Sequence, residues 1–322
     1  MDNCGNGTTI SYGSQCFPNY YYVNQIETSA ESNYNSLQAT LKLQNWHGLT
    51  STVNYTWAHS IDTASDGLDF VPNAAQPDNS WNPHAERASS NFDVRQRLQW
   101  YFSYNLPKVE TLKWLTNGWA VNGMFNFATG QPYTVHYLFE SDYNGSGEYF
   151  GRPDIIGSTK TKHMVSSADG GYNLLNAAAF AVPCTWDTTL NSGAGGCQAG
   201  SQHPGNEGRN AFNSPSFVNF DLSLNKTTKL TERVTLKLEA DLFNLFNHVN
   251  LSNPLLPGFS IDAFGTSNFV ASGSPTTGHL VGGGTNGTGF VQTVATPDVG
   301  SGNPFLGGGG PRTAQIAARI SF

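Results

Sequence analysis

The chain has 322 residues, of which 12% are charged and 12% are aromatic, and its formal net charge is −7. Soluble proteins carry about 25% charged residues, and disordered chains combine few aromatic residues with a high net charge, so the composition is typical of neither class. The mild acidity argues against the basic surface that nucleic-acid binding requires, and we therefore expect no nucleic-acid partner.

The N-terminal segment, residues 1–33, begins without the basic and apolar regions of a signal peptide. No stretch of about 18 apolar residues occurs in the chain, which excludes a transmembrane helix. Four cysteines form two local pairs, Cys4 with Cys16 and Cys184 with Cys197, in segments rich in Gly, Ser and Asn. These pairs predict two disulfides and an oxidising compartment, with four unrelated thiols as the alternative.

Apolar residues recur with a period of two in seven segments, which predicts seven β-strands. The segments are residues 34–46, 49–59, 91–106, 118–128, 216–226, 233–246 and 312–322. In the first segment Leu37, Ala39, Leu41 and Leu43 share one face, because successive side chains of a strand point to opposite sides. No charged residue is expected on the apolar face. The charged residues expected on the other face are Lys42, Asp93, Arg95, Arg97, Asp221, Lys237, Glu239, Asp241 and Arg319.

The connections between these segments alternate in length. Short turns at 47–48, 107–117 and 227–232 alternate with long connections at 60–90, 129–215 and 247–311. Short turns on one side and long loops on the other indicate an outer-membrane barrel, and strands of about 9–11 residues can cross a bilayer at a tilt. The last strand would then run toward the periplasm. Residues 1–33 would be an extracellular loop, residues 34–322 the barrel, and both cysteine pairs would lie outside.

Seven strands are an odd number, whereas bacterial barrels have even numbers of strands beginning at 8. An open sheet in lipid would leave backbone N–H and C=O groups without partners at both edges. Residues 17–28 could supply an eighth strand, although Pro18 and poor alternation make them a weak candidate. We therefore expect an all-β, antiparallel transmembrane barrel segment of about seven or eight strands, which is the C-terminal part of a larger barrel.

Several motifs, taken in order, resemble the C-terminal barrel of TonB-dependent outer-membrane receptors of the Oar-like type. They are SNYNSLQATL (32–41), VNYTWAHSID (53–62), NFDVRQRLQW (91–100), ATGQPYTV (128–135), GNEGRNAFNSPSFVNFDLSLNK (205–226), LKLEADLFNLFNHVN (236–250) and RTAQIAARISF (312–322). The resemblance implies a 22-stranded barrel around an N-terminal plug, a bacterial outer-membrane location, and energy from the TonB complex. Its expected partners are the lipid bilayer, the barrel-assembly machinery, the rest of the receptor and an extracellular ligand that the sequence does not name.

The candidate site residues are few. The nine charged residues of the strands would face the lumen, where they could grip a plug or a solute or form a hydrated, salt-bridged wall. The terminal Phe322 matches the aromatic end that the assembly machinery reads in this class of barrels. The acidic stretch 62–69 resembles a calcium loop but has Ala64 at its third position and Asn73 at its twelfth, so we interpret it as a polar turn. We expect no catalytic residue, metal or cofactor.

The function expected from these observations is that of a receptor or transporter segment for large ligands of the oligosaccharide or chelate class, and not that of an enzyme. The alternative is a soluble or surface β-sandwich for adhesion or carbohydrate binding, because a sandwich also alternates apolar and polar residues along its strands. The two differ in one structural respect. A sandwich buries its apolar rows against a second sheet, whereas a membrane barrel exposes them to lipid.

Overall fold

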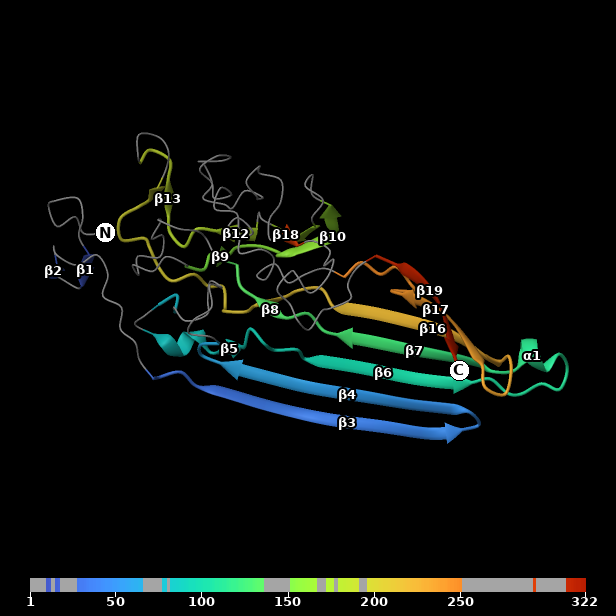
Figure 1. Cartoon of the computed structure of the whole chain (residues 1–322). Coiled ribbons are helices and arrows are strands. Elements are labelled where there is room, and N and C mark those ends of the chain that lie inside the picture. The colour runs from blue at the N-terminus through green and yellow to red at the C-terminus, as the bar shows by residue number, and fades with distance from the viewer. Residues whose placement is uncertain are drawn as a thin grey trace.

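The computed structural model describes residues 28–65, 77–79, 82–135, 151–166, 172–176, 179–190, 196–250 and 311–322, and the backbone of the short pieces 10–12, 15–17 and 292–293. Seven long strands form one antiparallel sheet in which each strand pairs with the next along the chain (Figure 1). They are β3 (Ser32–Trp46), β4 (Leu49–Asp62), β6 (Gln96–Asn105), β7 (Trp119–Ala128), β16 (Phe217–Lys229), β17 (Thr235–Phe243) and β19 (Thr313–Ser321). A short strand, β5 (Ala88–Ser89), extends the sheet beside the end of β4.

The short connections lie at one end of the sheet and the long ones at the other (Figure 1). Between β3 and β4 the chain turns at His47 and Gly48, whose φ angles are 50° and 88°. A Cβ atom on Gly48 would lie 2.6 Å from the carbonyl oxygen of Asn105, so this turn needs glycine both for its backbone angle and for its close approach to β6. Between β6 and β7 lies the one-turn helix α1 (Lys113–Thr116).

The N-terminal segment and the long connections form smaller pairs of strands. The pairs are β1 (Ile10–Tyr12) with β2 (Gln15–Phe17), β8 (Pro132–Tyr133) with β15 (Phe212–Asn213), β9 (Asp154–Ile155) with β12 (Phe180–Ala181), and β13 (Trp186–Asp187) with β14 (Gly196–Cys197). A three-stranded sheet joins β10 (Lys160–Ser166), β11 (Tyr172–Leu175) and β18 (Gln292–Thr293), and a 3-10 helix, η1, covers Pro83–Glu86. Among the described residues, no helix is long and apolar enough to span a membrane.

The strand register aligns apolar and polar side chains in rows on opposite faces of the sheet. One row runs through Leu41, Val53, Trp100, Phe125 and Phe220, which are direct cross-strand neighbours. One residue along each strand, a second row runs through Thr40, Asn54, Gln99, Asn126 and Asn219 on the other face. The apolar face of the sheet is therefore continuous across at least five strands, and so is the polar face.

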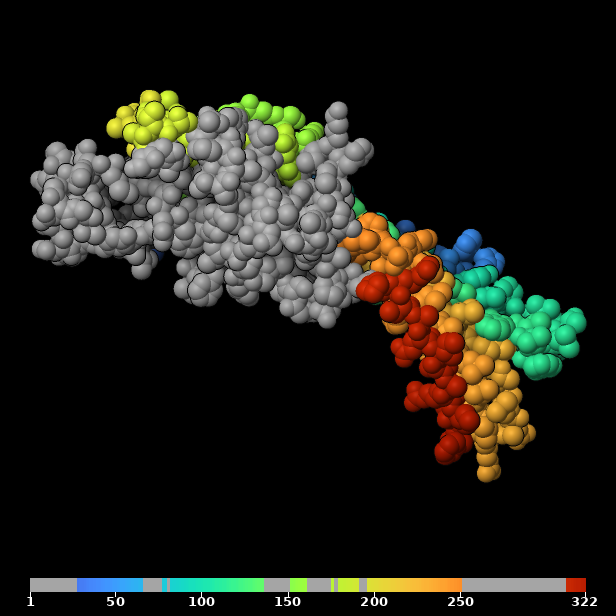
Figure 2. Space-filling view, turned by 90° about the horizontal axis from the view of Figure 1, so that it is seen from above, coloured from blue at the N-terminus to red at the C-terminus, as the bar shows by residue number. Residues whose placement is uncertain are grey.

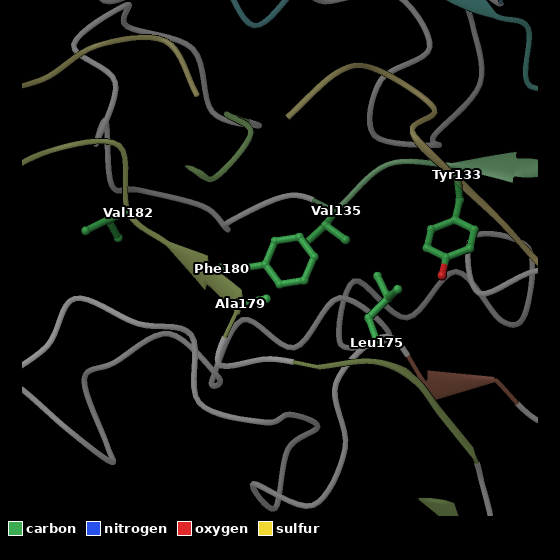
Figure 3. Close-up of a cluster of buried hydrophobic side chains, with 6 residues drawn as sticks. All are labelled: Tyr133, Val135, Leu175, Ala179, Phe180 and Val182. Atoms are coloured by element: carbon green, nitrogen blue, oxygen red, sulfur yellow. The ribbon is translucent and has the colours of Figure 1, made fainter. Parts of the chain in front are cut away.

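The apolar face is not covered by a second layer in the described part of the chain. Leu41 is 70% exposed and Ile316 is 86% exposed, and β19 lies open at the near edge of the sheet (Figure 2). The buried apolar cluster lies instead in the long connections and contains Tyr133, Val135, Leu175, Ala179, Phe180 and Val182 (Figure 3). This arrangement does not support the sandwich alternative, which requires the apolar rows of the strands to be buried.

Two details differ from the sequence-based predictions. The strand predicted over 91–106 begins only at Gln96, so Asp93 and Arg95 precede it. The reason is local: Asp93 is buried, and its carboxylate accepts a hydrogen bond from the backbone N–H of Ser60 at 2.9 Å, which holds this segment in a turn. No charged residue was predicted on the apolar face, but Lys226 is paired directly with Trp119 and shares the face of Leu224.

The predicted eighth strand at 17–28 lies almost entirely outside the described residues; only its ends, at Phe17 and Thr28, are described. The division of the chain into a loop at 1–33 and a barrel at 34–322 remains a prediction, with β3 beginning at Ser32.

Candidate functional site

The described residues of the connections 63–95 and 129–216 fold together at one end of the sheet, and we call them the loop platform. Arg152 lies at its centre and is 4% exposed. Its two terminal nitrogens donate to both carboxylate oxygens of Glu86, at 2.6 and 2.8 Å, and one of them lies 3.8 Å from the carboxylate of Asp78. Burial opposes the charged guanidinium, yet the hydrogen bond to Glu86 and the charges of Glu86 and Asp78 outweigh it and raise the pKa of Arg152.

A second buried arginine connects the platform to the sheet by hydrogen bonds. Arg209 is 3% exposed and donates to the backbone oxygens of Glu86 at 2.7 Å and Asp62 at 2.6 Å. It also bonds the carboxylate of Asp62 and the hydroxyl of Ser65. Asp62 is the last residue of β4, so this contact joins the connection before β16 to the end of β4.

Glu207 lies between the arginines and the apolar cluster. One carboxylate oxygen accepts the backbone N–H of Val135 at 2.8 Å, while the other is fully buried and has no hydrogen-bond partner among the described residues. Burial raises the pKa of Glu207 well above its ordinary value, and this effect outweighs the attraction of Arg152. Burial, together with the nearby Glu207, also raises the pKa of the Tyr133 hydroxyl. Burial thus favours the protonated form of the Glu207 carboxyl group.

Two of the motif segments quoted above pack against each other here. Tyr133 pairs with Phe212 across β8 and β15, and the backbone N–H of Asn210 donates to the hydroxyl of Thr134 at 2.7 Å. A Cβ atom on Gly130 would lie 1.7 Å from the carbonyl oxygen of Ser214, so only glycine allows this approach. The segments 128–135 and 205–216 thus pack against each other at the base of the platform, where it joins the sheet.

The outer part of the platform contains a cross-linked hairpin. Cys184 and Cys197 form a disulfide with a Cα–Cα distance of 5.6 Å, next to the pair β13 and β14. Nearby, the two ring nitrogens of His203 face the Ser201 carbonyl oxygen at 3.1 Å and the Asp154 carboxylate at 2.8 Å. Both partners are acceptors. The bond to the Ser201 carbonyl, and to a smaller extent the bond to the Asp154 carboxylate, raises the pKa of His203, although partial burial acts to lower it.

In a comparison with known protein families, residues 3–277 match a model described as the outer membrane beta barrel domain. The chain belongs to this outer-membrane β-barrel family. No curated protein and no solved structure matches it. The protein is therefore located in the bacterial outer membrane, and its sheet is a segment of a barrel wall. In such a barrel the long connections are extracellular and the short turns periplasmic, which places the loop platform outside the cell.

The barrel register shows where the charged residues predicted to face the lumen lie. Six of them fall on the polar face of long strands β3, β6, β16 and β17: Lys42, Arg97, Asp221, Lys237, Glu239 and Asp241. Arg319 of β19 is the direct neighbour of Lys237 and shares this face. The contacts among these charges are local, since Lys237 bonds Glu239 at 3.0 Å and Arg95 bonds Asp93 at 3.2 Å. They form a dispersed wall of charges, while their role toward a plug or solute stays a prediction.

The remaining predicted site residues lie apart from the platform centre. Cys4 lies outside the described residues, and only the backbone of Cys16 is described, in β2. Phe322 follows β19 directly and is 100% exposed. Among the described residues, no group of three or more His, Cys, Asp or Glu side chains could hold a metal ion.

Sequence reasoning did not identify the buried ionic cluster of Asp62, Asp78, Glu86, Arg152, Glu207 and Arg209. A usable indication was present, because Glu207 and Arg209 lie inside the motif GNEGRN. In a chain with only 12% charged residues, two charges on either side of a glycine in a loop motif are unusual enough to suggest a specific contact.

Proposed function

We propose that this chain forms the C-terminal barrel segment of a TonB-dependent outer-membrane receptor of the Oar-like type. Such a receptor would bind and import large extracellular ligands of the oligosaccharide or chelate class. The observation that carries the proposal is the loop platform: its connections fold around buried Arg–carboxylate contacts and would present a shaped surface to the medium. A simple pore does not need a folded structure of this kind above its strands.

The polar face of the sheet also supports a transport role. The row Thr40, Asn54, Gln99, Asn126 and Asn219 offers amide and hydroxyl groups, which can hydrogen-bond the hydroxyl groups of sugars or the oxygens of a chelate. Together with the charged wall, this face would form one side of a wet lumen.

The edges of the sheet fit a larger barrel. In the described part of the chain, β3 pairs only with β4 and β19 only with β17. Unpaired backbone groups are costly in lipid, so each edge requires a further strand. In the proposed receptor these strands, a plug and the TonB complex are partners, and the barrel-assembly machinery reads the end at Phe322. The proposal includes no enzymatic role and no cofactor.

The test uses the complete protein in its own outer membrane, with a fluorescent oligosaccharide and a labelled ferric chelate as probes. For the correct ligand class, we expect binding to continue when a protonophore removes the proton-motive force, while accumulation in the periplasm stops. Accumulation that continues with the protonophore would indicate a passive pore and would overturn the proposal. So would the absence of binding of both probes.

A further inference from the structure

The turn between β6 and β7, residues 106–118, exposes an unusual number of large apolar side chains at the periplasmic end of the barrel. They are Leu106, Val109, Leu112, Trp114 and Leu115, each between 38% and 68% exposed. In Figure 1 this turn, with α1, projects beyond the end of the sheet that lies opposite the loop platform. Five large apolar side chains within one turn require an apolar surrounding that the described residues do not supply.

The turn is well ordered by its own hydrogen bonds. The backbone N–H of Val109 donates to the side-chain oxygen of Asn117 at 2.6 Å, and the Thr116 hydroxyl donates to the Thr111 carbonyl at 2.9 Å. Leu112 has a φ of 49°, a left-handed conformation that is uncommon for a bulky residue, and its side chain is 59% exposed. The structure thus holds an apolar side chain outward at a conformational cost, which indicates a use for it outside the chain.

The apolar side of the turn continues the apolar face of the barrel wall. The indole N–H of Trp119 donates to the carbonyl oxygen of Leu115 at 2.8 Å, which fixes α1 against the start of β7. Trp119 pairs with Lys226, and the next pair on the same face is Val121 with Leu224. The exposed side chains of the turn therefore lie at the rim of the lipid-facing surface, where aromatic residues of barrels meet the bilayer interface.

The charge around this rim is positive although the chain is acidic. The turn 106–118 and the neighbouring stretch 226–234 contain five basic residues, Lys108, Lys113, Lys226, Lys229 and Arg233, and two acidic residues, Glu110 and Glu232, which gives a net charge of +3 against −7 for the whole chain. The two stretches are adjacent, because the backbone N–H of Thr227 donates to the Gly118 carbonyl at 2.8 Å.

The lysines at this rim differ in exposure: Lys226 is buried, at 7% exposed, and Lys113 is placed to reach a charged surface. The ammonium group of Lys226 lies 5.6 Å from the Trp119 ring centre and bonds the Asn117 carbonyl, so it points from the apolar face toward the turn. Lys113 is paired with Glu110 at 2.5 Å but remains 64% exposed, which leaves it free to contact a further anion.

We propose that the turn 106–118 is a membrane anchor for the inner leaflet of the outer membrane. Its apolar side chains insert among the acyl chains, and the exposed basic residues of the two adjacent turns, Lys108, Lys113, Lys229 and Arg233, bind the phosphate groups of anionic glycerophospholipids. Charge complementarity and continuity with the lipid-facing wall favour this occupant over a periplasmic protein. The anchor depends on the outer-membrane location and does not depend on the receptor's ligand.

The first experiment measures the depth of Trp114, the most exposed indole of the turn at 68%. The complete protein and its Trp114→Phe variant are reconstituted in vesicles of phosphatidylcholine with 25% phosphatidylglycerol, with acyl chains brominated near the interface. The emission of Trp114 is the part of the fluorescence that the variant lacks. We expect the brominated acyl chains to quench this part, and aqueous iodide not to quench it. If Trp114 emission is quenched by iodide and not by bromine, the turn lies in water and the proposal fails.

The second experiment tests the charge. The variant Lys108→Gln/Lys113→Gln is compared with the control Lys160→Gln, which removes a positive charge from β10 at the extracellular end. We expect the affinity for phosphatidylglycerol, measured by native mass spectrometry, to fall about five-fold for each lysine removed from the turn and to be unchanged in the control. Equal lipid retention in both variants would refute the charge-based binding.

A photo-crosslinking residue at position 114 separates the two kinds of occupant in whole cells. Adducts with phospholipid support the proposal, whereas a dominant adduct with a periplasmic protein would replace it with a protein-docking surface. Because none of these measurements involves ligand uptake, a failure here leaves the proposed receptor function untouched.

Discussion

In the long strands, apolar side chains such as Leu41 and Ile316 are exposed at 70% and 86%, whereas in the loop platform Glu86 and Arg152 are only 3% and 4% exposed. The usual distribution for a soluble protein is the reverse. The difference follows from the surroundings of each region. Lipid solvates the apolar face of the wall, so the strands need no core beneath it. The platform stands in water, and each of its buried arginines makes several hydrogen bonds.

The comparison also explains why the two regions should respond differently to the same type of substitution. Charge is costly where lipid is the solvent, even at a side chain that is geometrically exposed. In the platform the costly change is the loss of a charge, because its partners then stay buried without compensation. Four experiments test this contrast.

The largest effect is expected for Arg152→Met. This change removes the guanidinium group from beside the buried carboxylates of Glu86 and Asp78, which costs about 3–5 kcal/mol of local stability. Cleavage of the platform by thermolysin on intact cells should then rise by about two to four orders of magnitude. Arg319→Met removes an exposed arginine of β19 and is the matched control, with no change expected. Equal cleavage of the two variants would mean that the ionic cluster does not hold the platform.

The next effect is expected at the lipid-facing wall. Leu41→Arg introduces a charge into the apolar row, at a cost of about 2–4 kcal/mol near the bilayer midplane. Gln38→Arg, on the same strand and the opposite face, should cost less than about 0.5 kcal/mol. Urea unfolding from lipid vesicles measures both free energies. If the two variants were equally stable, the apolar face would not be in contact with lipid.

An intermediate effect is expected for the disulfide of the hairpin. Replacing Cys184 and Cys197 by serine removes a cross-link over a sequence separation of 13, worth about 3 kcal/mol in the chain-entropy account. Cleavage between residues 185 and 196 should become faster, while heat-modified gel mobility of the barrel should be unchanged. Reduction of the unmodified protein serves as the control, since it should reproduce the variant. A hairpin whose cleavage is insensitive to reduction would contradict this assignment.

The smallest effect is expected at His203, which is half exposed. Its pKa is raised in the folded protein by the Ser201 carbonyl and the Asp154 carboxylate, so protonation favours the folded state. The contribution is complete below the unfolded pKa of about 6.5 and is lost as the pH rises through the raised folded value. It should stay below about 1 kcal/mol, as for other exposed pairs.

Hydrogen exchange of peptides covering residues 151–160, corrected for intrinsic rates, should show this loss of protection between pH 5.5 and pH 8.5. The variant His203→Gln should show the same protection at both values. A pH response of equal size in the variant would assign the effect to another group.

The strand wall could be predicted closely from the sequence, because alternation with a period of two is a local property of each segment. All seven predicted strands are present, and the largest shift of a start is in the one predicted over 91–106, which begins at Gln96 because buried Asp93 bonds the Ser60 backbone. The ionic cluster of the platform could not be predicted in the same way. Its residues are single positions in irregular connections, and no periodic pattern marks them.

By itself, therefore, the sequence determined the strands, their two unlike faces and the membrane class of the fold, since these depend on neighbouring residues and on strand and loop length. The tertiary structure alone decided that Arg152 meets Glu86 across 66 positions and that Arg209 meets Asp62 across 147. It also decided that Lys226 lies on the apolar face beside Trp119. Contacts of this range arise only when strand register brings distant connections together, and register is a property of the assembled sheet.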